Sequence, residues 1–306
     1  MKKILVIGSL NIDFSLSVDK MPQIGETVNA NNLCINNGGK GANQAYTIAK
    51  LGGNISMLGL IGNDEYGKKI KNDLKKAGVN TNGIKQIKNI DTGKAFINVD
   101  KNGDNVITIF HGANYMVDEN FINKNIKLIN SADIILMQLE IPINTIKKIL
   151  ELSKNKIVIL DPAPADNKIM DYDLSNVYLM KPNETEIEKL TNIKIKDKQS
   201  YLDAANILIN KGVKNVLISL GSNGCVLINK DGYFKYDAIE SNVVDTTAAG
   251  DSFVASIAYG ISNNKSLEES INFASKVASI VVSKKGAQQS IPTLKEVLNN
   301  EKKNNN

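Results

Sequence analysis

The sequence predicts a doubly wound α/β domain with a mostly parallel sheet flanked by helices. Short apolar runs alternate with longer helical patterns over most of the chain, an order typical of βαβ units. The 306 residues are 42% hydrophobic, which is enough to bury one core of this size. No internal repeat or linker rich in Pro or Gly divides the chain. We therefore expect one domain over residues 1–300 and a polar, frayed tail at residues 301–306.

The strands of the main sheet are predicted where the apolar runs are short. They are expected at residues 4–8, 56–61, 134–138, 157–161, 177–180 and 216–220. The longer patterns with helical spacing predict helices at residues 42–50, 64–76 and 143–153. Residues typical of helix ends follow them, as Gly52 and Gly78 do.

Two further stretches predict a separate small sheet. Residues 12–35 and 92–110 alternate apolar and polar side chains, like half-exposed antiparallel strands, and residues 100–104 between two such runs suit a hairpin turn. A sheet inserted at the end of an α/β domain commonly covers the crevice at the strand ends, where ligands bind. We therefore expect lid strands at about residues 12–38 and 92–112.

Composition argues against nucleic acid and membrane partners. The net charge of +5 comes entirely from lysine on the cationic side, without the arginine that reads guanine and phosphate through two hydrogen bonds. Residues 4–7 form an apolar run too short for a signal peptide or a membrane span. Cys34 and Cys225 have no ligand or disulfide pattern around them, so a cytoplasmic protein is expected.

Residues 245–253 carry the most informative motif. Small residues there precede an apolar helical pattern, and the first N–H groups of a helix are unpaired donors that bind anions. Asp251 lies in the first turn, where it could take a proton from a hydroxyl group that attacks phosphorus. The alternative is that Asp251 only caps the helix.

A second glycine-rich segment, residues 36–45, also precedes a helix. It is not a P-loop, because Cys34 stands where that motif needs glycine and Gly41 where it needs Ser or Thr. A simple glycine turn would explain the glycines, but not the polar Lys40 and Asn43 beside them.

Polar residues also stand near the ends of predicted strands. Asn11 and Asp13 follow the first strand two apart, so a strand would point both the same way, and a carboxylate suits vicinal hydroxyl groups. No G-x-G-x-x-G follows this strand, so the dinucleotide-binding fingerprint is missing. Glu140 follows another buried strand, at the expected crevice. Asn183 and Glu186 open a helix, where they could cap it.

These motifs resemble, in order, six segments of the ribokinase family, also called the phosphofructokinase-B family of sugar kinases. The resemblance covers nearly the whole chain. It implies that Asp251 is the catalytic base and that an anion hole lies at Ala248, Ala249 and Gly250. It further implies a sugar site made of Asn11, Asp13, Gly39, Lys40, Asn43, Glu140 and Asp251.

The same resemblance implies sites for ATP and two cations. The nucleotide and a hydrated Mg²⁺ would lie near Asn183, Glu186, Ser219, Gly221, Gly250 and Ser275, where Ser219 replaces the usual Thr. A monovalent K⁺ would be held, partly through carbonyl groups, by Asp245, Thr247, Val281, Lys284, Gly286 and Ser290.

The activity that the resemblance implies is transfer of phosphate from ATP to the 5-hydroxyl of D-ribose, giving ribose 5-phosphate. A homodimer joined through the lid is also implied, since pairing would protect the open strand edges. Three alternative substrates stay open, namely 2-deoxyribose, a nucleoside and a fructose derivative. A catalytically silent sugar-binding protein is a further alternative.

Overall fold

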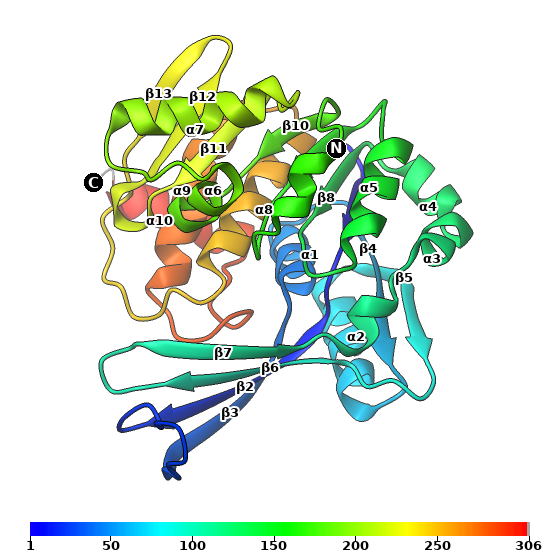
Figure 1. The fold of residues 1–306 in the computed structure, drawn as a ribbon, viewed down its shortest axis with the longest axis vertical. Helices are drawn as coiled ribbons and strands as arrows, with labels where there is room; N and C mark the ends of the chain where they lie inside the picture. Colours follow the sequence, from blue (N-terminus) through cyan, green and yellow to red (C-terminus); the bar gives the residue numbers. More distant parts are fainter. Residues whose placement is uncertain (305–306) are drawn as a thin grey trace.

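The computed structural model describes residues 1–304, and its centre is a large sheet (Figure 1). Within these residues nine strands lie in the order β13-β12-β11-β10-β9-β8-β1-β4-β5. All neighbours are parallel except β11–β12 and β12–β13. The strands are β1 Ile4–Ile7, β4 Ile55–Gly62, β5 Asn80–Ile87, β8 Ile134–Met137, β9 Ile157–Leu160, β10 Val177–Met180, β11 Asn215–Ser219, β12 Cys225–Asn229 and β13 Gly232–Tyr236.

Helices cover both faces of this sheet, so its central strands are apolar on both sides. In β1, Leu5 and Ile7 join one hydrophobic cluster, while Ile4 and Val6 join the other. The first cluster includes side chains of α3 Glu119–Lys124, α4 Ile126–Ser131, α5 Ile143–Leu152, α6 Glu184–Thr191 and α7 Lys198–Asn210. The second includes α1 Lys40–Lys50, α2 Glu65–Ala77, α8 Ala249–Ser262 and α9 Leu267–Val282.

The small sheet projects from one end of this domain, at the bottom of Figure 1. It consists of β2 Asn11–Val18, β3 Ala30–Gly38, β6 Gly93–Val99 and β7 Asn105–Phe110, in the order β3-β2-β6-β7. β6 and β7 are antiparallel, and the Asp100 carboxylate accepts the N–H groups of Asn102 and Asp104 in the turn between them. The predicted hairpin and the fold class are thus confirmed.

Several elements differ from the sequence-based expectations. Strands β5, β12 and β13 and helices α3, α4, α7 and α9 had not been predicted. The tail expected to fray from residue 301 is instead helical as far as Asn304, in α10 Leu294–Asn304. Two features anchor this helix. Val297 is fully buried, and Glu296 bonds with Thr293 ahead of the first turn. Residues 305–306 lie outside the described residues.

The topology gathers one set of chain segments at one edge. β1, β8, β9 and β10 are parallel neighbours, so their carboxyl ends meet beside the small sheet, and α1 and α8 begin near the same place. In open α/β sheets this crevice is where ligands bind. Among residues 1–304, no helix is both long and apolar enough to cross a membrane.

Candidate active site

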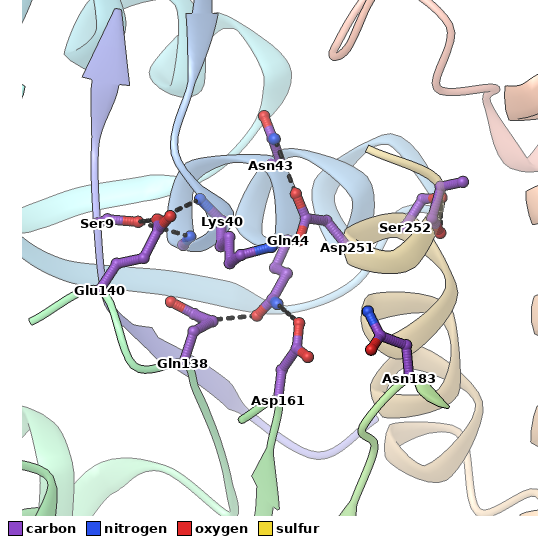
Figure 2. Close-up of polar contacts among 12 residues, drawn as sticks. Ser9, Lys40, Asn43, Gln44, Gln138, Glu140, Asp161, Asn183, Asp251 and Ser252 are labelled. Carbon is purple, nitrogen blue, oxygen red and sulfur yellow. Dashed lines mark hydrogen bonds and ion pairs between the residues drawn. The ribbon is translucent and has the colours of Figure 1, made fainter. Parts of the chain in front are cut away.

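The carboxyl ends of the central strands supply polar side chains that point toward one another (Figure 2). Ser9 follows β1, Glu140 follows β8 and Asp161 follows β9, and all three are buried. The Ser9 hydroxyl donates to the Glu140 carboxylate, which also accepts the N–H of Lys40 at 3.1 Å. Glu140 therefore joins the end of β8 to the first turn of α1. Ser9 was missed in the sequence, although its place after a buried strand could have signalled it.

Asp251 lies in the first turn of α8, as predicted, but it does not cap that helix. The residue before the helix is Ala248, in the left-handed region with φ 60°, and no side chain caps the first turn. Asp251 is 7% exposed, and its carboxylate accepts the Asn43 amide at 2.9 Å and lies 3.7 Å from the Lys40 ammonium. The structure thus brings three predicted residues of α1 and α8 together, and the capping alternative is wrong.

Two glycines make room for this arrangement ahead of α1. A Cβ at Gly38 would lie 2.0 Å from the Asp13 carboxylate, so only glycine lets that side chain lie across β3. Gly39 has φ 87°, and a Cβ there would lie 2.8 Å from the Asn11 backbone nitrogen. The chain can therefore turn from β3 into α1 while packing closely against the start of β2.

Asp13 and Lys40 both lie near the Glu140 and Asp251 carboxylates, which raise the pKa of each. Burial, followed by the nearby Glu140 and Asp251 carboxylates, raises the pKa of Asp13 to about 7, although Lys40 opposes the shift. For Lys40, burial lowers the pKa, but the carboxylates of Asp251, Asp161 and Glu140 outweigh burial and raise it above its usual range. Lys40 thus stays cationic among several acids.

Two residues that had not been predicted donate hydrogen bonds to the Asn11 and Asn43 side chains of this site. The Asn114 amide donates to the Asn11 side chain at 2.7 Å, and the Gln288 amide donates to the Asn43 side chain at 3.2 Å. Gln288 is buried and sits in the loop after α9, so it ties that loop to the Asn43–Asp251 pair. Neither residue belongs to a periodic pattern, and only the tertiary fold reveals the contacts.

The loops before α8 and after α9 meet at Asp245. Its carboxylate accepts the N–H and hydroxyl of Thr247 at 2.9 and 2.6 Å, and the N–H of Gly286 at 2.9 Å. The Lys284 side chain turns away to Glu296 at 3.4 Å. Of the other residues predicted for this site, Ser290 is buried and donates to the Ala287 carbonyl, and Val281 is buried in α9.

The residues predicted for the nucleotide include some at the start of α6, after β11 and within α9, and the first two of these segments are neighbours through a bridge between Asn183 and Ser219. Asn183 and Glu186 form a reciprocal capping box at the start of α6, so their predicted capping is confirmed. Ser219 ends β11 and donates to the Pro182 carbonyl at 3.4 Å, while Gly221 follows with φ 54°. Ser275 bonds to the Ile271 carbonyl of its own helix, α9.

A buried polar cluster beneath the site was also missed in the sequence. The Gln44 amide donates to Asp161 at 3.0 Å and accepts from Gln138 at 2.5 Å. The Lys181 ammonium lies 3.4 Å from the other Asp161 oxygen. Each of these side chains, apart from Gln44 in α1, follows a parallel strand, so the shared position at the strand ends was the available signal.

Comparisons with known proteins agree with this geometry. The model of the pfkB family carbohydrate kinases matches residues 1–294. Ribokinase of Haemophilus influenzae is 38% identical over 299 residues, covering 97% of each chain, and deoxyribokinase of Salmonella typhi is 32% identical over 296 residues, covering 96% of each. The structure of Arabidopsis thaliana ribokinase complexed with ribose and ATP has a TM-score of 0.87 and 32% identity, covering 97% of this chain and 98% of that one. This chain therefore belongs to the pfkB family of carbohydrate kinases.

Proposed function

We propose that this protein is an ATP-dependent kinase that phosphorylates the 5-hydroxyl of D-ribose. The observation that carries the proposal is the buried Asp251 carboxylate at the start of α8, held by Asn43 and Lys40. Glu140 and Asp13 lie close enough to perturb the same cluster of charges. The likeness to a ribokinase complexed with ribose and ATP supports both substrates. A silent sugar-binding protein would not need a buried, oriented carboxylate at an anion-binding helix end.

In this reaction Asp251 is the base and the sugar hydroxyl is the nucleophile. As the hydroxyl oxygen forms its bond to the γ-phosphorus, its proton passes to the Asp251 carboxylate and the bond from phosphorus to the ADP oxygen breaks. Asn43 and Lys40 fix the carboxylate while this happens. Asn11, Asp13, Gly39 and Glu140 are proposed to orient the sugar.

The start of α8 stabilises the charge that develops on the transferring group. We assign the anion hole to the backbone N–H groups of Ala248, Ala249 and Gly250, whose attraction for an anion the helix dipole increases. The Ala249 N–H bonds to the Thr246 carbonyl at 3.1 Å, so it has to share its hydrogen with the anion or turn from that carbonyl. The backbone holds the donors at the start of the helix before the reaction begins, so they cost little reorganisation in the transition state. The left-handed Ala248 turns the chain into the helix at this point.

The remaining residues are assigned to ATP and the two cations. Glu186 and Asn183 already bond to each other's backbone, but a carboxylate accepts up to about four hydrogen bonds, so Glu186 keeps capacity for a hydrated Mg²⁺. Ser219, Gly221 and Ser275 are proposed to line the nucleotide. Asp245, whose carboxylate joins the two loops, fits a K⁺ site that the carbonyl groups of Val281, Lys284 and Gly286 would complete, together with Thr247 and Ser290.

The first test measures ATP-dependent phosphorylation of ribose, 2-deoxyribose, fructose, fructose phosphates and nucleosides. Each sugar is assayed with KCl and with LiCl at the same ionic strength. We expect preference for ribose and faster turnover with K⁺. If the enzyme turns over only another compound of this panel, that compound replaces ribose as the substrate. If it turns over none of them, a sugar-binding protein is favoured. Equal rates in KCl and LiCl would contradict the cation site.

A cytoplasmic location is proposed with this function, because ATP is the donor and the described cysteines, Cys34 and Cys225, are free thiols.

The small sheet is proposed to close over the sugar and to pair with the same sheet of a second copy. Its outer strands, β3 and β7, expose apolar side chains, among them Leu33, Ile35, Val106, Ile107 and Phe110. Light scattering is expected to give twice the 33.3 kDa mass of the chain, and Ile107→Lys is expected to give the single mass. Monomeric wild-type protein at micromolar concentration would overturn the dimer.

A further inference from the structure

Lys181 is a buried cation that the roles assigned so far do not use. It directly follows β10, is 4% exposed, and its ammonium lies 3.4 Å from the Oδ1 atom of Asp161, which is 1% exposed. Placing both charges out of water is costly, and burial of such a pair rarely adds stability by itself. Stability of the fold therefore does not explain why these two charges are buried together.

The ion pair is also incomplete as a structural contact. Charge-assisted hydrogen bonds usually span about 2.7–2.9 Å, whereas this pair is separated by 3.4 Å. In the described part of the chain, Asp161 Oδ1 has no hydrogen-bond partner, while Oδ2 accepts the Gln44 amide. An ammonium group has three donors, so Lys181 keeps donor capacity that Asp161 does not take up.

The Lys181 ammonium also lies against the start of α8. A Cβ added to Gly250 would lie 3.4 Å from the Lys181 Nζ atom. Gly250 is the residue before Asp251, and its own N–H belongs to the proposed anion hole. Since glycine has no side chain, nothing of residue 250 separates the ammonium from that backbone.

We propose that Lys181 is a further catalytic residue, whose ammonium donates a hydrogen bond to the phosphoryl group as it transfers from ATP to the sugar. The inference rests on the proposed kinase function. Negative charge spreads over the phosphoryl oxygens in the transition state, and a preplaced cation in a site without water stabilises it strongly. The Lys181 side chain only donates a hydrogen bond in this step, and no covalent bond to it forms or breaks.

Asp161 acts through Lys181 as a positioning residue. Gln44 holds one Asp161 oxygen, and Gln138 holds Gln44 in turn, so the carboxylate has a fixed orientation below the ammonium. Burial raises the pKa of Asp161 to about 6, although Lys181 and Lys40 oppose the shift. At neutral pH the Asp161 carboxylate is thus ionised and attracts the Lys181 ammonium.

The test compares Lys181→Met with the double variant Lys181→Met/Asp161→Asn. We expect Lys181→Met to lower kcat by about 10²–10³-fold, with affinities for ribose and ADP alone within about threefold of wild type. Binding of ADP with aluminium fluoride, Mg²⁺ and ribose, which mimics the transferring group, should weaken by a similar factor to kcat. The single variant leaves the buried Asp161 carboxylate without its ion-pair partner, so the unfolding temperature of the variant should fall.

The double variant separates catalysis from folding. Removing both charges should restore the unfolding temperature, while kcat stays as low as in Lys181→Met. If the double variant instead regains a kcat near that of wild type, Lys181 only neutralises Asp161 and the inference is wrong. Equal losses of ADP affinity and of aluminium fluoride complex affinity would overturn it too.

Lys156→Met is the matched control. Lys156 is a half-buried lysine beside the amino end of β9, where it donates to the carbonyls of Asn130 and Ala132. Its loss should leave kcat unchanged. Failure of the kinase function would show in the wild-type assay, whereas failure of this inference would show as a Lys181→Met enzyme that keeps its kcat and its aluminium fluoride affinity.

Discussion

Asp251→Asn is expected to lower kcat for ribose phosphorylation by about 10²–10⁴-fold, the range typical of a lost general base. The amide cannot take up the proton of the sugar hydroxyl, so attack on phosphorus would need an unassisted alcohol. Asn43 can still donate to the new side chain, so the fold of the site should persist. Steady-state kinetics and ribose titration by calorimetry measure the two effects separately.

Asp203→Asn is the control for this substitution. Asp203 is an exposed carboxylate of α7, bonded to the Gln199 side chain and remote from the strand ends. It should leave kcat unchanged. If Asp251→Asn keeps a kcat within about tenfold of wild type, another group takes the proton and Asp251 is not the base. A large loss of ribose affinity with kcat preserved would instead make Asp251 a sugar ligand only.

The parts of the site that lie on local motifs could be predicted from the sequence. Small residues before an apolar helix indicated the anion site at the start of α8, and an acid after a buried strand indicated Glu140. These signals are local, because strand ends and helix starts have their own residue preferences. Most strands that are buried on both faces were predicted for the same reason, since each is a short apolar run.

The contacts between distant segments could not be predicted in this way. Gln288 meets Asn43 across 245 residues of sequence, and Lys181 approaches Gly250 only because β10 ends beneath α8. β12 and β13 were missed because an antiparallel hairpin at the edge of the sheet breaks the βαβ rhythm. Helix α9 was missed even though its sequence carries a start signal, the Ser266 and Glu269 capping box.

A second large effect is expected at Asp13, where function and stability oppose each other. In the unfolded chain its carboxyl ionises near 3.8, whereas in the fold its pKa is about 7. Between these values the folded protein holds a proton that the unfolded chain has released. The unfolded state then binds fewer protons, so the free energy of unfolding falls as pH rises from about 4 to about 7. Asp13→Asn removes this slope, and should melt at a higher temperature than wild type at pH 8 but not at pH 4.

The same substitution should weaken ribose binding at pH 8. A hydrogen bond to a charged group contributes about 1.5–3 kcal/mol, which predicts a rise in the ribose Kd of about tenfold to 100-fold. Wild-type affinity should improve as pH rises through 7, because ionised Asp13 is the better acceptor, and the variant should lose this dependence. Asp104→Asn, in the exposed turn after β6, should change neither property. If Asp13→Asn binds ribose as tightly as wild type, Asp13 does not contact the sugar. If Asp13→Asn is no more stable than wild type at pH 8, the ionised Asp13 carboxylate does not destabilise the fold. If Asp13→Asn gains stability and loses ribose affinity, then the Asp13 charge destabilises the free enzyme and also contributes to binding of the sugar.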